Sequence, residues 1–219
     1  MKITSLQKYK GTTYEVELDD DRKIYLHIDI IVDFGLRTGM ELDRSELRKI
    51  IYASNFRRAY QYALHLLDVR DYSRKEMFGK LVKTYKSEKL CSAVMDKLTE
   101  LDFINDSRYA EKLARKYVEI RRFGARRASM EMYRKGVPKE VIEDALCIYN
   151  EKYAENLSEL LTTSKYERLL TDRDDRKSVE KAKNSLVRLG YSFTEVNEAV
   201  RNYFDSVEDN IMQTENVQS

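Results

Sequence analysis

The sequence predicts a mainly α-helical protein, in which three tandem three-helix repeats form an elongated curved array behind a small N-terminal β-hairpin or sheet module with a helix. Three observations support this fold class. One proline and seven glycines among 219 residues leave few helix breakers. From Asn55 to about Asp205, apolar residues recur at the spacing of one helix face. The sequence also resembles itself when it is shifted by about 51 or 54 residues, as a repeat protein does.

The N-terminal module, residues 1–54, is rich in Thr, Tyr, Val and Ile. Segments 12–18 and 23–32 are predicted strands, with an acidic turn at residues 19–21 between them and a third strand at residues 3–9. His27 is expected on the face of a strand. Asp43 and Glu46 have the spacing of a capping box, which predicts a helix from this point to about Ala53.

The predicted repeats cover residues 55–105, 106–152 and 153–206, and an acidic polar tail follows at 207–219. Each repeat contains helices A, B and C, and their limits come from capping and turn residues. In repeat 1 the expected helices are 55–69, one that starts at Ser73, and 88–100. In repeat 2, Asn105 or Asp106 is expected to cap helix A. In repeat 3 the expected helices A and B are 151–170 and 176–189. Gly136 and Gly190 end the second and third helices B, Pro138 fits the first turn of a helix C, and Ser192 with Glu195 caps the last helix C.

Aligning the repeats produces apolar columns at offsets of three, four and seven residues, which predict the shared core. The columns are Ala59/Ala110, Ala63/Ala114 and Leu67/Val118 in helix A; Met77/Ala128/Ala182 and Leu81/Met132/Leu186 in helix B; and Cys91/Ile142/Val196, Val94/Ala145/Ala199, Met95/Leu146/Val200 and Leu98/Tyr149/Tyr203 in helix C. Helix A of repeat 3 aligns only with an insertion. Short helices of this kind hide their apolar faces by stacking in series.

Composition indicates a soluble, helix-rich chain with charged faces. Charged residues make up 36% and hydrophobic residues 42%, and the mean hydropathy is −0.65. Neither a signal peptide nor an apolar run of membrane-spanning length occurs, which predicts a cytoplasmic protein without a membrane partner. Cys91 and Cys147 are too few for a disulfide framework, and both are expected to be reduced core residues.

The strongest functional signal is a local excess of basic residues. The 40 basic and 38 acidic residues of the chain nearly cancel, but residues 106–135 contain ten Lys/Arg against four Asp/Glu, a net charge of +6. The candidate binding residues are Arg70, Arg74, Lys75, Arg115, Arg121, Arg122, Arg126, Arg127, Arg134 and Lys135. Guanidinium groups can pair with phosphates or with carboxylates of a partner. The alternative is a solvated helix face with internal ion pairs to acids such as Glu131; recurrence of basic residues in helix B of repeats 1 and 2 favours a binding surface.

Two other function classes receive less support. A helix-turn-helix DNA reader has a similar arrangement of helices and glycine turns, but here the charge is spread over the units. Catalysis lacks a recognisable centre, because His27 and His65 lie in different modules and form no ligand or general-base pattern. The sequence therefore predicts a binding protein that is not an enzyme and needs no metal or cofactor.

The columns, together with Asp102–Ala110 (DFINDSRYA), resemble the RecX family of bacterial recombination regulators. Arg122-Phe123-Gly124, then Arg127 and Arg134–Val137, are also similar to the central repeat of that family. The resemblance covers about residues 55–205, and the N-terminal strands resemble the extension of RecX proteins from Firmicutes-type bacteria. This chain departs from the family pattern at Tyr85 and Asp102, where glycine is usual.

The resemblance implies a monomeric, non-enzymatic regulator of the RecA recombinase in DNA repair, homologous recombination and the SOS response. Such a protein binds in the groove of the RecA–DNA filament and modulates, mostly by inhibition, its recombination, ATPase and coprotease activities. Single- or double-stranded DNA is a further candidate partner. A DNA-binding helical-repeat protein that acts independently of RecA is the alternative.

Overall fold

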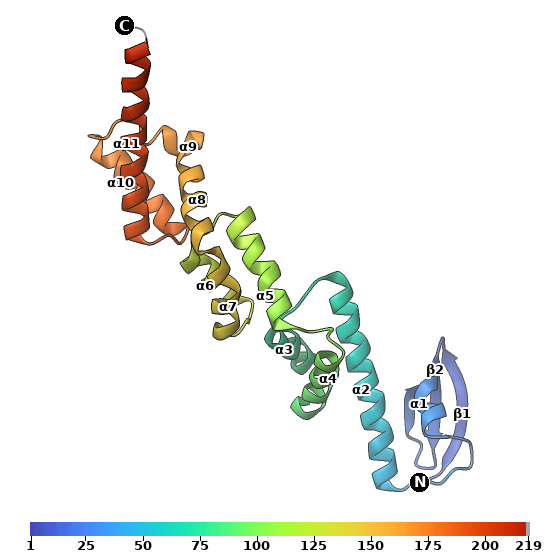
Figure 1. Cartoon of the computed structure of the whole chain (residues 1–219). Helices are drawn as coiled ribbons and strands as arrows, with labels where there is room; N and C mark the ends of the chain where they lie inside the picture. The colour runs from blue at the N-terminus through green and yellow to red at the C-terminus, as the bar shows by residue number, and fades with distance from the viewer. Residues whose placement is uncertain (218–219) are drawn as a thin grey trace. The chain divides into compact units, whose positions relative to one another are not determined.

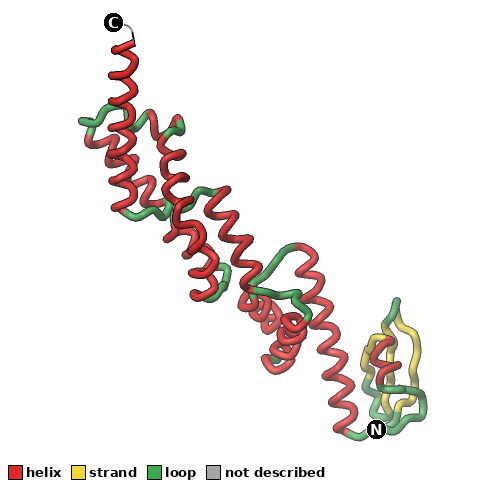
Figure 2. The backbone as a smooth tube through the Cα atoms, viewed as in Figure 1, coloured by secondary structure: helices red, strands yellow, loops and turns green. Residues whose placement is uncertain are grey.

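The computed structural model describes the backbone of residues 1–217 and the side chains of residues 1–208. Two compact units are present. Residues 1–71 and 76–104 form the first unit, and residues 72–75 belong with the chain from Asn105 onward in the second. Helices dominate both, and the strands are confined to the N-terminal part of the first unit (Figures 1 and 2). This confirms a mainly helical fold with an N-terminal antiparallel sheet.

The N-terminal sheet has three antiparallel strands in the order β1-β2-β3: β1 (Ile3–Lys10), β2 (Thr13–Leu18) and β3 (Lys23–His27). The alternation of apolar and polar residues places one face of the sheet inward. Val16, Leu18 and Leu26 on that face are buried, and they form a small core with residues of the helices that follow. The predicted third strand is confirmed.

The prediction of one strand from Lys23 to Val32 was wrong, because β3 ends at His27 and helix α1 (Ile28–Asp33) follows directly. Ile30 and Ile31 are both buried. Adjacent residues of a strand point to opposite faces, whereas a helix can turn both toward one core. His27 is therefore an N-cap: its Nδ1 accepts the backbone N–H of Asp29 at 3.2 Å.

Helix α2 (Arg44–Val69) is continuous through the position where two helices were expected to meet, near Ala53 and Asn55. The predicted capping box is present at its start, since the Asp43 carboxylate accepts the N–H of Glu46 and the Glu46 carboxylate accepts that of Asp43. No glycine or proline interrupts the segment, so the helix continues. Its first turns cover the sheet core, and its later turns pack on α4.

The remaining helices of the first unit are the predicted helices B and C of repeat 1, α3 (Arg74–Tyr85) and α4 (Glu88–Glu100). Met77 and Leu81 of α3 are fully buried, as are Cys91, Val94 and Leu98 of α4. Burial raises the pKa of the Cys91 thiol, as expected for an inert reduced cysteine.

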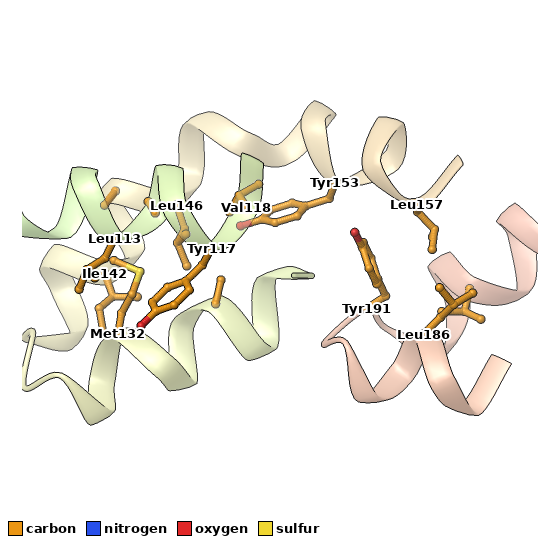
Figure 3. Close-up of a cluster of buried hydrophobic side chains, with 14 of the residues drawn as sticks. Leu113, Tyr117, Val118, Met132, Ile142, Leu146, Tyr153, Leu157, Leu186 and Tyr191 are labelled. Atoms are coloured by element: carbon orange, nitrogen blue, oxygen red, sulfur yellow. The ribbon is translucent and has the colours of Figure 1, made fainter. Parts of the chain in front are cut away.

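The second unit contains the helices of repeats 2 and 3. They are α5 (Asp106–Arg115), a π-helical turn (Lys116–Ile120), α6 (Ala125–Arg134), α7 (Lys139–Leu146), a 3₁₀ turn (Cys147–Tyr149), α8 (Asn150–Leu161), α9 (Ser164–Glu167), α10 (Arg176–Arg188) and α11 (Phe193–Val217). One buried cluster, partly shown in Figure 3, runs through both repeats. Repeats 2 and 3 therefore share a core.

The apolar columns are confirmed as core positions with a few exceptions. All members of the helix B columns are fully buried, as are the first two helix A columns. Leu67, Tyr149, Ala199 and Tyr203 are half-buried. Cys147 was predicted to be a core residue and is exposed, because α7 ends at Leu146 and the following 3₁₀ turn directs Cys147 outward.

The turns between helices B and C use a left-handed residue in each repeat. Gly136 (φ 80°) and Gly190 (φ 99°) supply it in repeats 2 and 3, as predicted. In repeat 1 the left-handed residue is Lys86 (φ 53°). The alignment places the glycine position at Tyr85, but Tyr85 is the last residue of α3, so the left-handed residue comes one position later. Asp102 (φ 55°) adopts the same conformation, which glycine adopts at less cost.

Each of these turns in the second unit contacts the residue that precedes a helix B. The Ser73 hydroxyl donates to the carbonyl oxygen of Lys135 at 2.6 Å. The aligned residue Gly124 donates its N–H to the carbonyl oxygen of Leu189 at 2.9 Å, and the Arg126 N–H donates to that of Gly190. We call the contact of Gly124 and Arg126 with Leu189 and Gly190 the repeat joint. It holds the start of α6 against the turn between α10 and α11.

Helix A of repeat 3 is interrupted, in contrast to the predicted continuous helix at 151–170. The hydroxyls of Thr162 and Thr163 donate to the carbonyl oxygens of Glu159 and Leu160, and α8 ends here. Such hydroxyls compete with the backbone bonds of a helix. At the other end, α11 continues to Val217 into the predicted acidic tail; the side chains beyond Glu208 and residues 218–219 lie outside the described residues.

Tyr153 of α8 is a buried residue whose hydroxyl has no hydrogen-bond partner among the described residues. We expect Tyr153→Phe to raise the free energy of unfolding by about 1 kcal/mol, since an unpaired buried hydroxyl costs roughly 1–3 kcal/mol. Burial raises the pKa of Tyr153 to about 12. The unfolded chain loses this proton near pH 10, so stability falls as pH rises from about 10 toward 12.

Urea unfolding of both proteins at pH 7.5 and across pH 9.5–11.5 measures the two effects. The gap in favour of the variant should widen with pH, because phenylalanine does not titrate. A variant that is less stable at pH 7.5, or a gap that stays constant with pH, would contradict this account of Tyr153.

Candidate partner-binding surface

The basic segment begins where α5 passes into the π-helical turn. The Arg121 N–H donates to the carbonyl oxygen of Lys116, five residues back, and Asn156 donates its side-chain amide to Val118 at 2.9 Å. The chain then reverses at Arg122, a non-glycine residue with φ 51°. Arg121 therefore follows the π-helical turn, before the reversal, whereas Arg126 and Arg127 belong to the next helix, α6.

Arg122 and Arg127 are bound within the second unit. The Arg122 guanidinium pairs with Glu159 at 2.8 Å, and its carbonyl oxygen accepts the hydroxyl of Tyr191 at 3.0 Å. The Arg127 guanidinium lies 4.2 Å from the centre of the Phe123 ring and donates to the carbonyl oxygen of Arg188 at 3.1 Å. These two residues fix the chain reversal and the repeat joint, so their primary role is structural.

Arg121 and Arg126 are different, because both are exposed and neither side chain forms an ion pair or hydrogen bond with the described part of the chain. Their guanidinium groups can bind a phosphate or a carboxylate without first breaking an internal contact. Arg126 lies in the first turn of α6, where the helix dipole also favours an anionic group.

The exposed face of α6 continues from Arg126 at intervals of one helix turn. We call Arg126, Met130, Tyr133 and Arg134 the α6 surface. Met130 is 44% and Tyr133 is 62% exposed, although both are large and apolar. Lys75 places its ammonium group 5.8 Å from the centre of the Tyr133 ring. Arginine, methionine and tyrosine are the residues that protein interfaces favour, so this composition is typical of a binding surface.

Other candidate residues make weaker or local pairs. Arg134 pairs with Glu131 at 3.1 Å, as the alternative interpretation expected, and Arg115 pairs with Glu119 at 3.2 Å. Such exposed pairs contribute little and can be exchanged for a partner's anion. Arg70 lies in the first unit, where it ends α2 and pairs with Glu76 at 3.3 Å.

Two candidates form hydrogen bonds through their backbone. The Arg74 N–H donates to the Asp106 carboxylate at 2.8 Å, and the Lys135 carbonyl oxygen accepts the Ser73 hydroxyl. Sequence reasoning missed Met130. Its position four residues after Arg126 is the signal that would have identified it, because residues i and i+4 share a helix face.

The structure describes no group of three or more His, Cys, Asp or Glu residues that could hold a metal ion. Among the helices whose placement is described, none combines the length and the apolar character that crossing a bilayer requires. The arrangement therefore defines a class: a protein of tandem three-helix repeats that exposes an arginine-bearing helix face.

Comparisons with known proteins identify the family. The model of the first three-helix domain of RecX matches residues 59–98, and the model of the second matches residues 105–146. The regulatory protein RecX of Clostridium acetobutylicum is 27% identical over 202 residues, which cover 90% of this chain and 93% of the relative. That of Streptococcus sanguinis is 29% identical over 199 residues, covering 91% and 76%. The chain belongs to the RecX family of regulatory proteins.

Solved structures agree with this assignment. The crystal structure of RecX from Lactobacillus salivarius is 28% identical, covers 68% of this chain and 97% of its own, and superposes with a TM-score of 0.63. A second RecX crystal structure covers 92% of this chain and 98% of its own with a TM-score of 0.72; at 23% identity it shows the shared fold. The predicted family and fold class are thereby confirmed.

Proposed function

We propose that this protein regulates the RecA recombinase by binding the RecA–DNA filament in its groove. Binding would limit the ATPase, recombination and coprotease activities of the filament. The observation that carries the proposal is the α6 surface, where Arg126, whose guanidinium group has no partner among the described residues, shares a helix face with exposed Met130 and Tyr133. Arg121 adds a second exposed guanidinium group without such a partner. A RecA–DNA filament offers both phosphates and protein carboxylates, and arginine forks bind either group.

Serial repeats suit such a partner. A filament presents the same surface many times, and a chain with several linked contact surfaces binds it more tightly than one surface does. The action is regulatory binding without catalysis, and the proposed setting is the bacterial cytoplasm, where RecA acts.

The test is a RecA ATPase assay on single-stranded DNA into which the full chain is titrated. We expect the hydrolysis rate to fall along a saturable curve as the chain occupies the filament. Far-UV circular dichroism confirms that the chain is folded, and the heat-unfolded chain is the control. An unchanged ATPase rate, together with the absence of binding to preformed filaments, would contradict the proposal.

The alternative function, binding to DNA without RecA, is favoured by the net charge of +6 in residues 106–135. In that case the chain should bind bare DNA tightly, and the affinity should fall steeply with salt by an amount set by the number of phosphates contacted. The salt dependence of DNA binding is large between about 50 and 200 mM salt. Affinities for bare DNA and for RecA filaments, measured across that range, separate the two functions. Tighter and less salt-dependent binding to filaments favours the RecA proposal.

A further inference from the structure

A groove between α8 and α11 has none of the arginine residues discussed above in its lining. It has a volume of about 650 Å³ and is lined by one face of each helix. Tyr153, Leu157 and Leu161 form a buried apolar floor, and the small side chains Ala154 and Ser158 leave room above it. The α8 face extends from Asn150 to Leu161, which at about 1.5 Å per residue is roughly 16 Å, or three turns of a helix.

Carboxylates surround this groove, and its lining contains no lysine or arginine. Glu195 accepts the Ser192 N–H at 2.6 Å in the capping box of α11. Glu167 and Glu198 are exposed and make no ion pair or side-chain hydrogen bond with the described residues. The groove therefore combines an apolar floor with unpaired negative charge at its rim.

A smaller groove occupies the equivalent place in repeat 2. It measures about 200 Å³, lies between α5 and α7, and includes Glu111, Asp144 and Ile148. A shift of 54 residues aligns Asp144 with Glu198 and Ala145 with Ala199, which line the corresponding walls. Glu111 and Asp144 are exposed, and Ile148 is 75% exposed. Acidic grooves between helices A and C thus recur in two successive repeats.

The lining of the repeat 2 groove includes no residue of α6, so this groove is separate from the α6 surface. A nucleic acid is an unsuitable occupant, since carboxylates repel phosphates. A helix with an apolar stripe and flanking positive charges fits both the floor and the rim, and it would complete a bundle with α8 and α11.

We infer that the α8–α11 groove docks a lysine-bearing amphipathic helix of the protein partner, and that the α5–α7 groove extends the same contact. This inference rests on the proposed function, in which RecA in the filament is that partner. The α6 surface then binds anionic groups, and the grooves bind cationic protein segments. One unit thereby contacts a nucleoprotein filament with two surfaces of opposite charge.

Zero-length carbodiimide crosslinking tests the inference, because the reagent joins a carboxylate to a lysine amine only when the two are in contact. The full chain is crosslinked on RecA filaments assembled on single-stranded DNA, and the linked peptides are identified by mass spectrometry. We expect Glu167 and Glu198 to link to RecA lysines. The double variant Glu167→Gln, Glu198→Gln should lose these links and bind filaments about three- to tenfold more weakly, as expected for two exposed ion pairs.

Two further variants control for charge and for shape. Glu143→Gln with Glu155→Gln removes the same net charge from exposed residues outside the groove lining, and should leave filament affinity unchanged. Ser158→Trp fills the groove but keeps its charges, and should weaken binding as the first double variant does. Thermal unfolding of each variant confirms that it folds.

The outcomes separate this inference from the proposed function. Normal filament binding with no groove crosslinks, and with unchanged affinity of the groove variants, overturns the groove assignment and leaves the proposed function intact. Crosslinks from Glu167 or Glu198 to a second copy of this chain also overturn it. A chain that does not bind filaments at all overturns both.

Discussion

Reversing the charge of Arg121 and Arg126 together, as Arg121→Glu with Arg126→Glu, should weaken binding to RecA filaments by roughly ten- to hundredfold while the fold stays intact. Each charge-assisted contact is worth about 1.5–3 kcal/mol when its groups are desolvated and less at an exposed site. Both side chains are exposed and form no ion pair or hydrogen bond with the described chain, so their replacement removes no such internal interaction. Filament binding by fluorescence anisotropy measures the effect.

A matched control is Lys177→Glu with Arg201→Glu, which changes the net charge equally at exposed residues of α10 and α11. If binding depended only on the total charge of the chain, both double variants would weaken it alike. The site assignment requires the Arg121/Arg126 variant to bind much more weakly than the control. Equal affinities would remove these two arginines from the proposed contact.

Arg122→Ala and Arg127→Ala provide a contrast that the sequence alone does not predict. The Arg122 guanidinium pairs with Glu159, and that of Arg127 stacks on Phe123. Truncating either side chain should therefore lower the thermal stability of the protein more than its affinity for the filament. An alanine scan that replaced all four arginines together would therefore mix loss of contact with loss of structure. Separating the pairs avoids that ambiguity.

Gly190→Ala should destabilise the second unit by roughly 3 kcal/mol or more. Gly190 has φ 99°, which a side chain adopts at a cost of about 1–2 kcal/mol. Its Cβ would also overlap Arg127 at the repeat joint, and overpacking adds about 1–3 kcal/mol. Gly124→Ala should act similarly, since its Cβ would overlap the backbone of Gly190.

Gly79→Ala is the matched control for this prediction. Gly79 lies inside α3, and a Cβ there meets nothing within 4 Å. Alanine should stabilise this helix by about 0.5–1 kcal/mol, because glycine loses more backbone entropy on folding. Urea unfolding of the three variants gives the comparison. A Gly190→Ala protein that unfolds at the wild-type urea concentration would show that the repeat joint does not hold the two repeats together.

The sequence predicted the helical columns and most helix ends, because each depends on a local pattern. Capping boxes at Asp43 and Ser192, and left-handed glycines at 136 and 190, require only neighbouring residues. The errors occurred where tertiary contacts decide. Ile28–Val32 has strand composition, yet helix α1 buries two adjacent isoleucines. The absence of glycine and proline permits α2 to continue past Ser54, but its packing on α4 depends on residues far along the chain.

The candidate site was predictable as a basic segment but not as individual roles. Charge counting identifies Arg121, Arg122, Arg126 and Arg127 equally, since it cannot show which of them have internal partners. Glu159 and Arg188, which bind two of them, lie far along the chain. The acidic grooves could not be predicted for the same reason, because Glu167 and Glu198 line one groove only after α8, α9 and α11 have packed.

The repeat joint gives the array a direction. The start of α6 has no side-chain cap, and the carbonyl oxygen of Gly190 in the next repeat accepts the N–H of Arg126. The start of α10 is capped within its own repeat, because the Asp175 carboxylate accepts the N–H groups of Lys177 and Ser178. Helix α6 therefore depends on the repeat that follows it for a backbone partner at its start, whereas α10 is capped by a residue of its own repeat.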